Sequence, residues 1–280
     1  MRWTGLEITA SVGLGDQVLA PAGLATPYGD HADFEIIGGT ARQITEASTG
    51  QAAFVITAEA EEITLRYRLA PGSGSAYPAA MFIPQPSRYS RAAEALIEEA
   101  QAIAPDLQGV ARARAIACAT AERFTYGHPQ DRFNDGLDYV PALGCGLAEG
   151  SCVDINTYFI ASLRAAGIKT GYVYGCFFPE EKQGRAQDMH CWVVTEIEGA
   201  TQEWDIAHHL KLGTKTIAPA LNPKPGWRIA MSHSMGLCFP EIGVEGLKVL
   251  AEPARIKPEG GLAELSRVEL RALEAAEIPA

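Results

Sequence analysis

A cysteine in the middle of the chain is the first residue whose position favours chemistry. Cys152 stands at the start of a predicted helix that runs from about Val153 to Ala166, with Ser151 as its N-cap and Gly167 just past its end. A thiol there meets unpaired backbone N–H groups and the positive end of the helix dipole, and both stabilise a thiolate. Cys152 is therefore a candidate nucleophile, although a cysteine in an apolar helix can also be a small core residue.

A thiol nucleophile needs a base, and the base needs a third group that fixes its tautomer. Two predicted strands, Met189–Glu198 and Gln202–Ile206, are joined by a tight turn and contain His190 and Asp205. Counting the register from the turn places Asp205 about opposite positions 192 to 194, and neighbouring positions on adjacent strands lie roughly 5 Å apart. Cys152, His190 and Asp205 can thus form one group, although a strand histidine is often structural and Asp205 could cap a turn.

The elements around these residues predict an α+β fold with three parts: a β-rich N-terminal domain at 1–85, a catalytic domain at 86–255 and a helical tail at 256–280. Short alternating segments in the first part predict antiparallel strands with one wet face. Helical spacing predicts two helices before the cysteine-bearing helix and one at the end of the chain. The expected strands are Leu6–Thr9, Phe34–Ile37, Phe54–Thr57, Ile63–Tyr67 and Ile168–Phe178, and the expected helices are Arg88–Ala102, Gly109–Arg123 and Leu262–Ala275.

Several of these motifs together resemble the transglutaminase-like superfamily of papain-type thiol enzymes, in particular its bacterial cysteine-peptidase-like branch. The resemblance covers roughly Gly109 to His209. It is carried by Gly-Ser-Cys-Val-Asp at 150–154, the helix end and strand at 163–175, His-Cys-Trp at 190–192 and Glu-Trp-Asp at 203–205. The resemblance implies a core in which the nucleophile helix packs on an antiparallel sheet, preceded here by the N-terminal β-layer.

The resemblance also implies roles for the three residues: Cys152 as nucleophile, His190 as general base and acid, and Asp205 as the residue that orients His190. It implies a thiol-dependent hydrolase of peptide or amide bonds that works through a thioester and needs no cofactor. Acyl transfer to an amine is the alternative reaction. The family usually has a small residue where Cys191 stands and often a proline where Ile206 stands, so the substrate, which could be a peptide, a protein or a small amide, is left open.

Other residues are candidates for supporting roles. Tyr139, Asp188 and Trp192 are candidate substrate-binding residues, and Cys145 could form a redox pair with Cys152 across the flexible segment between them. A non-catalytic binding module that uses the same cleft, with Trp192 and Trp204 as an apolar floor, is a second interpretation of the pattern.

A metal site is a rival from another class, because cysteines and histidines are frequent in the second half of the chain. Cys145 and Cys152 are seven residues apart, unlike the short knuckles of structural zinc sites. His190 and Cys191 should point to opposite faces of their strand, so they are not expected to bind one ion. We therefore predict no metal centre.

Composition limits the partners and the compartment. The 280 residues are 47% hydrophobic and 20% charged, which allows a sizeable core. With 34 Asp and Glu against 23 Lys and Arg, the formal charge is −11, which disfavours nucleic acid as a partner. We expect no signal peptide, no membrane span and a cytoplasmic location, where the six cysteines would be free thiols. The oligomeric state is left open.

Overall fold

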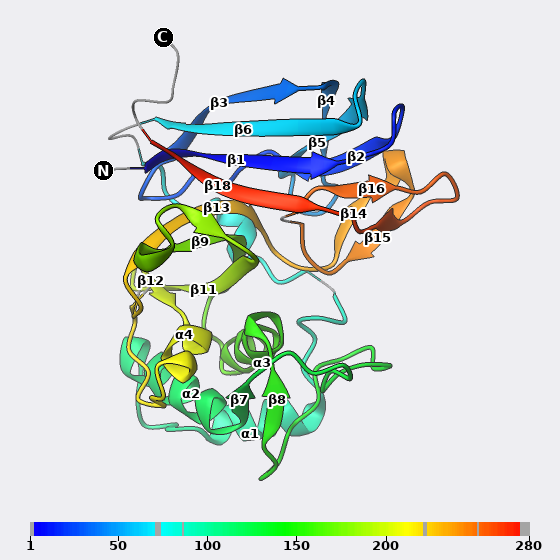
Figure 1. Cartoon of the computed structure of the whole chain (residues 1–280). Coiled ribbons are helices and arrows are strands. Elements are labelled where there is room, and N and C mark those ends of the chain that lie inside the picture. The colour runs from blue at the N-terminus through cyan, green and yellow to red at the C-terminus, as the bar shows by residue number, and fades with distance from the viewer. Residues whose placement is uncertain (1–2, 71–73, 86, 221–222, 251, 275–280) are drawn as a thin grey trace.

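The computed structural model describes residues 3–70, 74–85, 87–220, 223–250 and 252–274. The fold is α+β, as predicted. Two five-stranded antiparallel sheets pack face to face, a four-stranded antiparallel sheet lies against them, and helices cover the far side of that third sheet (Figure 1).

The two five-stranded sheets are built mainly from the N-terminal segment. In spatial order, one contains β10 (Arg185–Ala186), β18 (Val268–Glu274), β1 (Trp3–Ser11), β6 (Glu62–Ala70) and β3 (Asp30–Ile37), and the other contains β17 (Leu262–Ala263), β16 (Ala254–Ile256), β2 (Gln17–Pro21), β5 (Ala52–Ala58) and β4 (Gly39–Thr45). Strand β1 shows the expected alternation, because Leu6 and Ile8 are buried between the sheets while Glu7 and Thr9 face outward. The predicted N-terminal strands are confirmed, and β2 and β4 add to them.

The predicted C-terminal helix is wrong. Its residues form β17 and β18, and β18 pairs antiparallel with β1, with Leu270 opposite Ile8. Leu270 and Ala272 point into the sandwich while Arg271 points outward, so the segment has a strand period of two. Pairing with the free edge of β1 outweighs the helix propensity of its Ala, Leu and Glu residues. The end of the chain thus completes the N-terminal β-layer; residues 275–280 of the predicted tail lie outside the described part.

The four-stranded sheet carries the residues singled out above. Its spatial order is β12 (Ala200–Trp204), β11 (Met189–Ile197), β9 (Thr170–Pro179) and β13 (Gly226–His233). The turn between β11 and β12 is tight, with positive φ at Glu198 and Gly199. Gly175, in the middle of β9, lets β13 approach closely, because a Cβ there would meet the Ile229 carbonyl oxygen at 2.1 Å.

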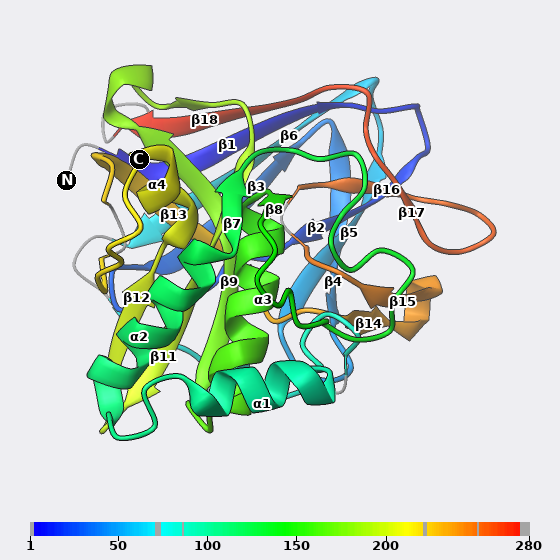
Figure 2. The same cartoon turned by 90° about the horizontal axis from the view of Figure 1, so that it is seen from below.

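Three helices pack on one face of this sheet and are seen from the side in Figure 2: α1 (Glu94–Ala102), α2 (Gly109–Glu122) and α3 (Cys152–Ala165). The boundaries of α2 and α3 lie within a residue of those predicted. Helix α1 begins six residues later than predicted, because Ala92 and Ala93 pair with Val140 instead of entering the helix. The core between α3 and the sheet includes Phe159, Val193 and Trp204.

Short elements complete the chain. They are β7 (Phe124–Tyr126), β8 (Ala148–Gly150), α4 (Ile206–Lys211), β14 (Leu237–Phe239), β15 (Val244–Leu247) and the 3₁₀ turns Ala79–Phe82, Glu180–Lys182 and Pro240–Ile242. Strands β7 and β8 pair in parallel, with Tyr126 opposite Gly150. Within the described residues, none of the helices has the length and apolar character that a bilayer crossing requires.

Candidate active site

Cys152 is the first residue of α3, as the sequence predicts. Ser151 precedes it as the N-cap, and Asp154 Oδ2 accepts hydrogen bonds from the Ser151 backbone N–H at 2.9 Å and from Ser151 Oγ at 2.7 Å. This local bonding fixes the turn that presents the thiol. The parallel pairing of β8 with β7 fixes the approach to the turn, since Gly150 lies two residues before the cysteine.

His190 and Asp205 lie in contact, as predicted. His190 Nε2 is 2.9 Å from Asp205 Oδ2, and the two side chains are 5% and 0% exposed. Burial by itself would lower the pKa of His190, but the charge and hydrogen bond of Asp205 and the contact with Cys152 raise it above its ordinary value. Because Nε2 is bound to the carboxylate, Nδ1 is left to face the thiol. The geometry favours an imidazolium.

Asp205 lies just after the strand and not within it, where the sequence predicts it. The strand ends at Trp204, and Asp205 is the N-cap of α4, where its Oδ1 accepts a hydrogen bond from the His208 backbone N–H at 3.0 Å. Val193 pairs with Trp204, so Asp205 follows at the level of the predicted positions 192 to 194 of the neighbouring strand. The cap and the contact with His190 use different oxygens of one carboxylate, so the start of the helix helps to hold the residue that orients the base.

Two more side chains surround this carboxylate. Arg228, from β13, makes an ion pair with Asp205 Oδ2, and His208 Nδ1 lies 2.8 Å from the same oxygen and 3.0 Å from Arg228 Nη2. Burial would raise the pKa of Asp205, but the charges of His190 and Arg228 hold it well below its ordinary value. Asp205 is thus a permanent anion.

His208 also supports the ring of His190. The two imidazoles stack with centroids 4.2 Å apart and planes 9° apart. Burial lowers the pKa of His208 to about 4, and the nearby charges of His190 and Arg228 act in the same direction. His208 is therefore neutral at neutral pH, and its ring can face an imidazolium without charge repulsion.

Cys152 has two hydrogen-bond donors. The pKa of its thiol is held well below the ordinary value by a hydrogen bond from Cys191 first and then by the hydrogen bond and charge of His190, against the effect of burial. Burial and the charge of Cys152 raise the pKa of Cys191, so Cys191 keeps its proton and can donate it. Asn156, one turn along α3 from Cys152, positions Cys191 by donating from Nδ2 to its carbonyl oxygen at 3.1 Å and its Sγ at 3.3 Å.

A cleft of about 730 Å³ opens at the thiol. Cys152, His190 and Asp188 line it. Tyr139 and Trp192 are not among its lining residues. Trp192 is 2% exposed and packs on the face of β11 that points away from α3, as does Val194.

The remaining residues singled out by sequence are also separate from the cleft. Tyr139 is 37% exposed on the loop before β8, and Trp204 is buried under α3. Cys145 is an exposed thiol that does not line the cleft, and all six cysteines are free.

One group of side chains in the described part has metal-binding geometry. Ligand atoms of His190, Asp205 and His208 all lie within 4.8 Å of one another. The guanidinium of Arg228 already contacts the Asp205 carboxylate and His208 Nδ1. A cation between these atoms would have to displace a buried positive charge, so the group fits a hydrogen-bonded carboxylate better than a metal centre.

Sequence reasoning missed four residues of this site: Arg228, His208, Asn156 and Tyr126. His208 had a usable signal, because an aspartate three residues before it is the spacing of an N-cap. Asn156 shares a face of α3 with Cys152 through its i+4 spacing. Tyr126 lines the cleft from β7, and Arg228 reaches the site from β13; neither has a local signal, because only the pairing of distant segments brings them close.

A family model matches the part of the chain that holds most of this site. Residues 95–204 match the family model of the transglutaminase-like superfamily, a span that includes Cys152 and His190 and ends one residue before Asp205. This part of the chain is therefore similar to the transglutaminase-like superfamily. With the cysteine at a helix start and the buried histidine, this similarity supports a thiol-dependent hydrolase or acyltransferase in general terms.

Similar solved structures include a candidate cysteine protease from Cytophaga hutchinsonii, with 13% identity and a TM-score of 0.48 over 98% of this chain and 99% of that one. The periplasmic domain of TgpA from Pseudomonas aeruginosa is also similar, with 11% identity and a TM-score of 0.40 over 77% of this chain and 91% of that one. No curated protein matches the chain by sequence.

The hydrogen bond from Cys191 can be tested directly on the thiol of Cys152. We expect Cys191→Ala to raise the pKa of Cys152, because the thiolate loses a donor. The measurement is the rate of Cys152 alkylation by iodoacetamide against pH, read by peptide mass spectrometry. Cys191→Ser keeps a donor and is the matched control. Identical pH profiles for Cys191→Ala and wild type would contradict the assignment.

The contact between His190 and Asp205 predicts a pH effect of definite sign. Burial lowers the pKa of His190 and Asp205 raises it, so Asp205→Asn should shift the pKa of His190 downward and the imidazolium should be lost at a lower pH than in wild type. An NMR titration of the labelled His190 ring measures this shift. Asp188→Asn removes a carboxylate of the same cleft that makes no hydrogen bond to His190, and it should leave the titration nearly unchanged. An unchanged titration in Asp205→Asn would rule out the electrostatic role.

Proposed function

We propose that this protein is a thiol-dependent hydrolase that cleaves peptide or amide bonds through a thioester acyl-enzyme. Cys152 is the nucleophile, His190 is the general base and acid, and Asp205 orients His190. The observation that carries the proposal is the buried thiol at a helix start, in contact with a histidine whose far nitrogen is bound to a buried carboxylate 2.9 Å away.

In the first half of the reaction, the Cys152 thiolate attacks the carbonyl carbon of the substrate and the carbonyl oxygen becomes an oxyanion. The backbone N–H of Cys152, in the first turn of α3, has no partner within the helix and can donate to this oxyanion. The His190 imidazolium gives its proton to the leaving amine. The C–N bond breaks and the acyl group remains on sulfur as a thioester.

In the second half, neutral His190 takes a proton from water, and the resulting nucleophile attacks the thioester. The acid leaves, and the thiolate and the imidazolium are restored. An amine that enters in place of water would give acyl transfer instead, which is the alternative reaction of the same site. Asp205 keeps its negative charge throughout, because Arg228 and His208 remain bound to it.

Tyr126 is the side chain we assign as a second donor to the oxyanion. It lines the cleft on β7, next to the strand that leads to Cys152. Burial, followed by the charge of Cys152, raises its pKa, so the phenol keeps its proton. His128 Nε2 lies 3.2 Å from Tyr126 Oη and can donate to it, which leaves the phenol proton for the substrate.

The decisive experiment is the capture of the acyl-enzyme. We expect incubation with short peptides and amide-bearing acyl donors to give a mass adduct on Cys152, and we expect product release by the wild type. Cys152→Ser should form no thioester, and His190→Ala should slow acylation strongly because the thiolate loses its partner. Absence of any adduct or product with every donor would refute the hydrolase and the transferase together.

The role of Tyr126 predicts a specific kinetic change. Tyr126→Phe should lower kcat by about 10²-fold, the usual cost of removing one oxyanion donor, with little change in KM. Steady-state kinetics on the best donor from the capture experiment provides the measurement. Tyr139→Phe removes a phenol outside the cleft and is the control. A change in KM alone would assign Tyr126 to substrate binding instead.

A further inference from the structure

The cleft carries an excess of positive charge that the rest of the chain does not have. The protein as a whole has a formal charge of −11, yet five Lys and Arg residues line the cleft against three Asp and Glu residues. Most acidic residues therefore lie outside the cleft. A charged residue of the cleft can bind a substrate only if it is not already paired within the protein.

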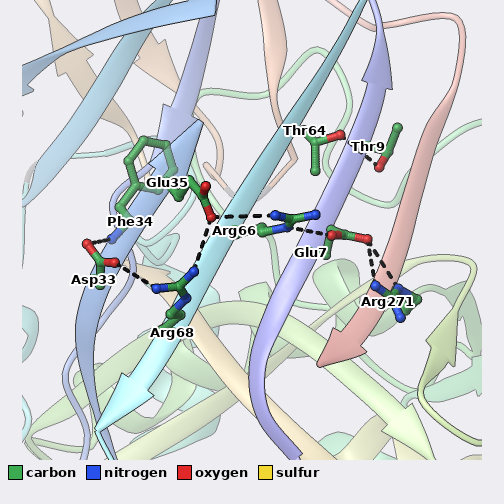
Figure 3. A network of polar contacts seen from close by, with 9 residues as sticks. All are labelled: Glu7, Thr9, Asp33, Phe34, Glu35, Thr64, Arg66, Arg68 and Arg271. Carbon is green, nitrogen blue, oxygen red and sulfur yellow. Dashed lines mark hydrogen bonds and ion pairs between the residues drawn. The ribbon is translucent and has the colours of Figure 1, made fainter. Parts of the chain in front are cut away.

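Two of the three acidic residues are already neutralised by neighbouring arginines. Glu7, on the outer face of β1, is bound on one side by Arg66 at 2.8 Å and on the other by Arg271 at 3.1 Å (Figure 3). Glu269, on β18, makes an ion pair with Arg267 at 2.5 Å. Asp188 is the remaining acid of the cleft, and no ion pair is found for it among the described residues.

Fewer of the basic residues of the cleft are paired with a carboxylate. Lys224 is paired with Glu181 at 2.6 Å, and Arg271 is paired with Glu7. For Lys182, Arg185 and Lys211, no carboxylate lies within ion-pair distance in the described part of the chain. Three available cations thus face one available anion, Asp188.

These three cations come from three different elements around the cleft. Lys211 ends α4, the helix that Asp205 caps, and its Nζ lies 4.3 Å from the ring centroid of Tyr126. Lys182 ends the 3₁₀ turn after β9, and Arg185 begins β10 and pairs in register with Arg271. The cleft thus runs from Cys152 to the outer face of β18, which is longer than a single acyl group requires.

We infer that the substrate is an acidic peptide segment, whose Asp or Glu side chains bind Lys182, Arg185 and Lys211 while its backbone amide lies at Cys152. This inference rests on the proposed function and names its substrate class. Exposed charge pairs contribute little individually, so each cation should alter the preference about two- to fivefold, and salt should weaken it. Several such charges together provide selectivity.

The first test measures charge preference at Cys152 without a substrate. The ratio of alkylation rates by iodoacetate, an anion, and iodoacetamide, its neutral analogue, reports the potential at the thiol. We expect this ratio to fall about two- to fivefold in Lys211→Gln and further in the double variant with Arg185→Gln. His190 is unchanged in these variants, so its own charge cancels in the comparison.

Lys257→Gln is the control, because Lys257 lies between β16 and β17 and does not line the cleft. It should leave the ratio of the wild type unchanged. A ratio that stays constant in Lys211→Gln and in the double variant would overturn the inference.

The second test uses peptides that differ only in charge. Matched series carry Glu, Gln or Lys on both sides of the scissile amide, and kcat/KM is measured at low and at high salt. We expect the Glu series to be fastest at low salt, with the advantage lost in the Lys211 and Arg185 double variant. Equal rates, or faster cleavage of the Lys series, would refute the acidic preference while leaving the hydrolase intact. No acylation of Cys152 by any series would refute the proposed function and this inference together.

Discussion

A single buried carboxylate organises the catalytic half of this protein. Removing an ionised aspartate from water costs several kcal/mol unless charges and hydrogen bonds compensate for it. Asp205 is fully buried and is compensated by Arg228, by His190, by His208 and by the first turn of α4. Three separate segments of the chain must therefore meet at one point, and any arrangement that leaves one of them out leaves a buried charge incompletely paired. The same charge that demands these partners also keeps His190 protonated.

The pKa of the Cys152 thiol depends on Asp205 indirectly, through His190. A helix start alone favours a thiolate modestly, by roughly 0.3–1 kcal/mol for an exposed charge. Two neighbouring residues of β11, Cys191 and His190, lower the pKa of Cys152 further through hydrogen bonds to its thiol. Neighbouring residues of a strand point to opposite faces. Both can therefore reach one sulfur only if that sulfur lies near the end of the strand. His190 is the second residue of β11, at that end of the strand.

The β-layer lines part of the cleft, although it holds none of Cys152, His190 and Asp205. Its outer face, with Glu7 and Arg271, forms the far wall of the cleft, and β10 joins the loop before His190 to the edge of β18. On that face Glu7 is paired with Arg66 and Arg271 (Figure 3). Among the described residues, Lys182, Arg185 and Lys211 of the same cleft make no ion pair with a carboxylate. The last strand of the chain therefore closes the sandwich and also borders the site.

The sequence by itself determined the elements whose signals are local: the α3 start with Cys152, the strand of His190, the strand that ends just before Asp205, and the tight turn that sets their register. Local periodicity and capping decide such elements within a few residues. Only the tertiary structure decided that the last segment is a strand, because an available edge on β1 outweighs helix propensity. It also decided the positions of Arg228, which pairs with Asp205, and of Tyr126, whose ring lies under Lys211; both partners are distant in sequence. The energy that places them comes from burial and charge pairing between distant segments, and local sequence does not encode such contacts.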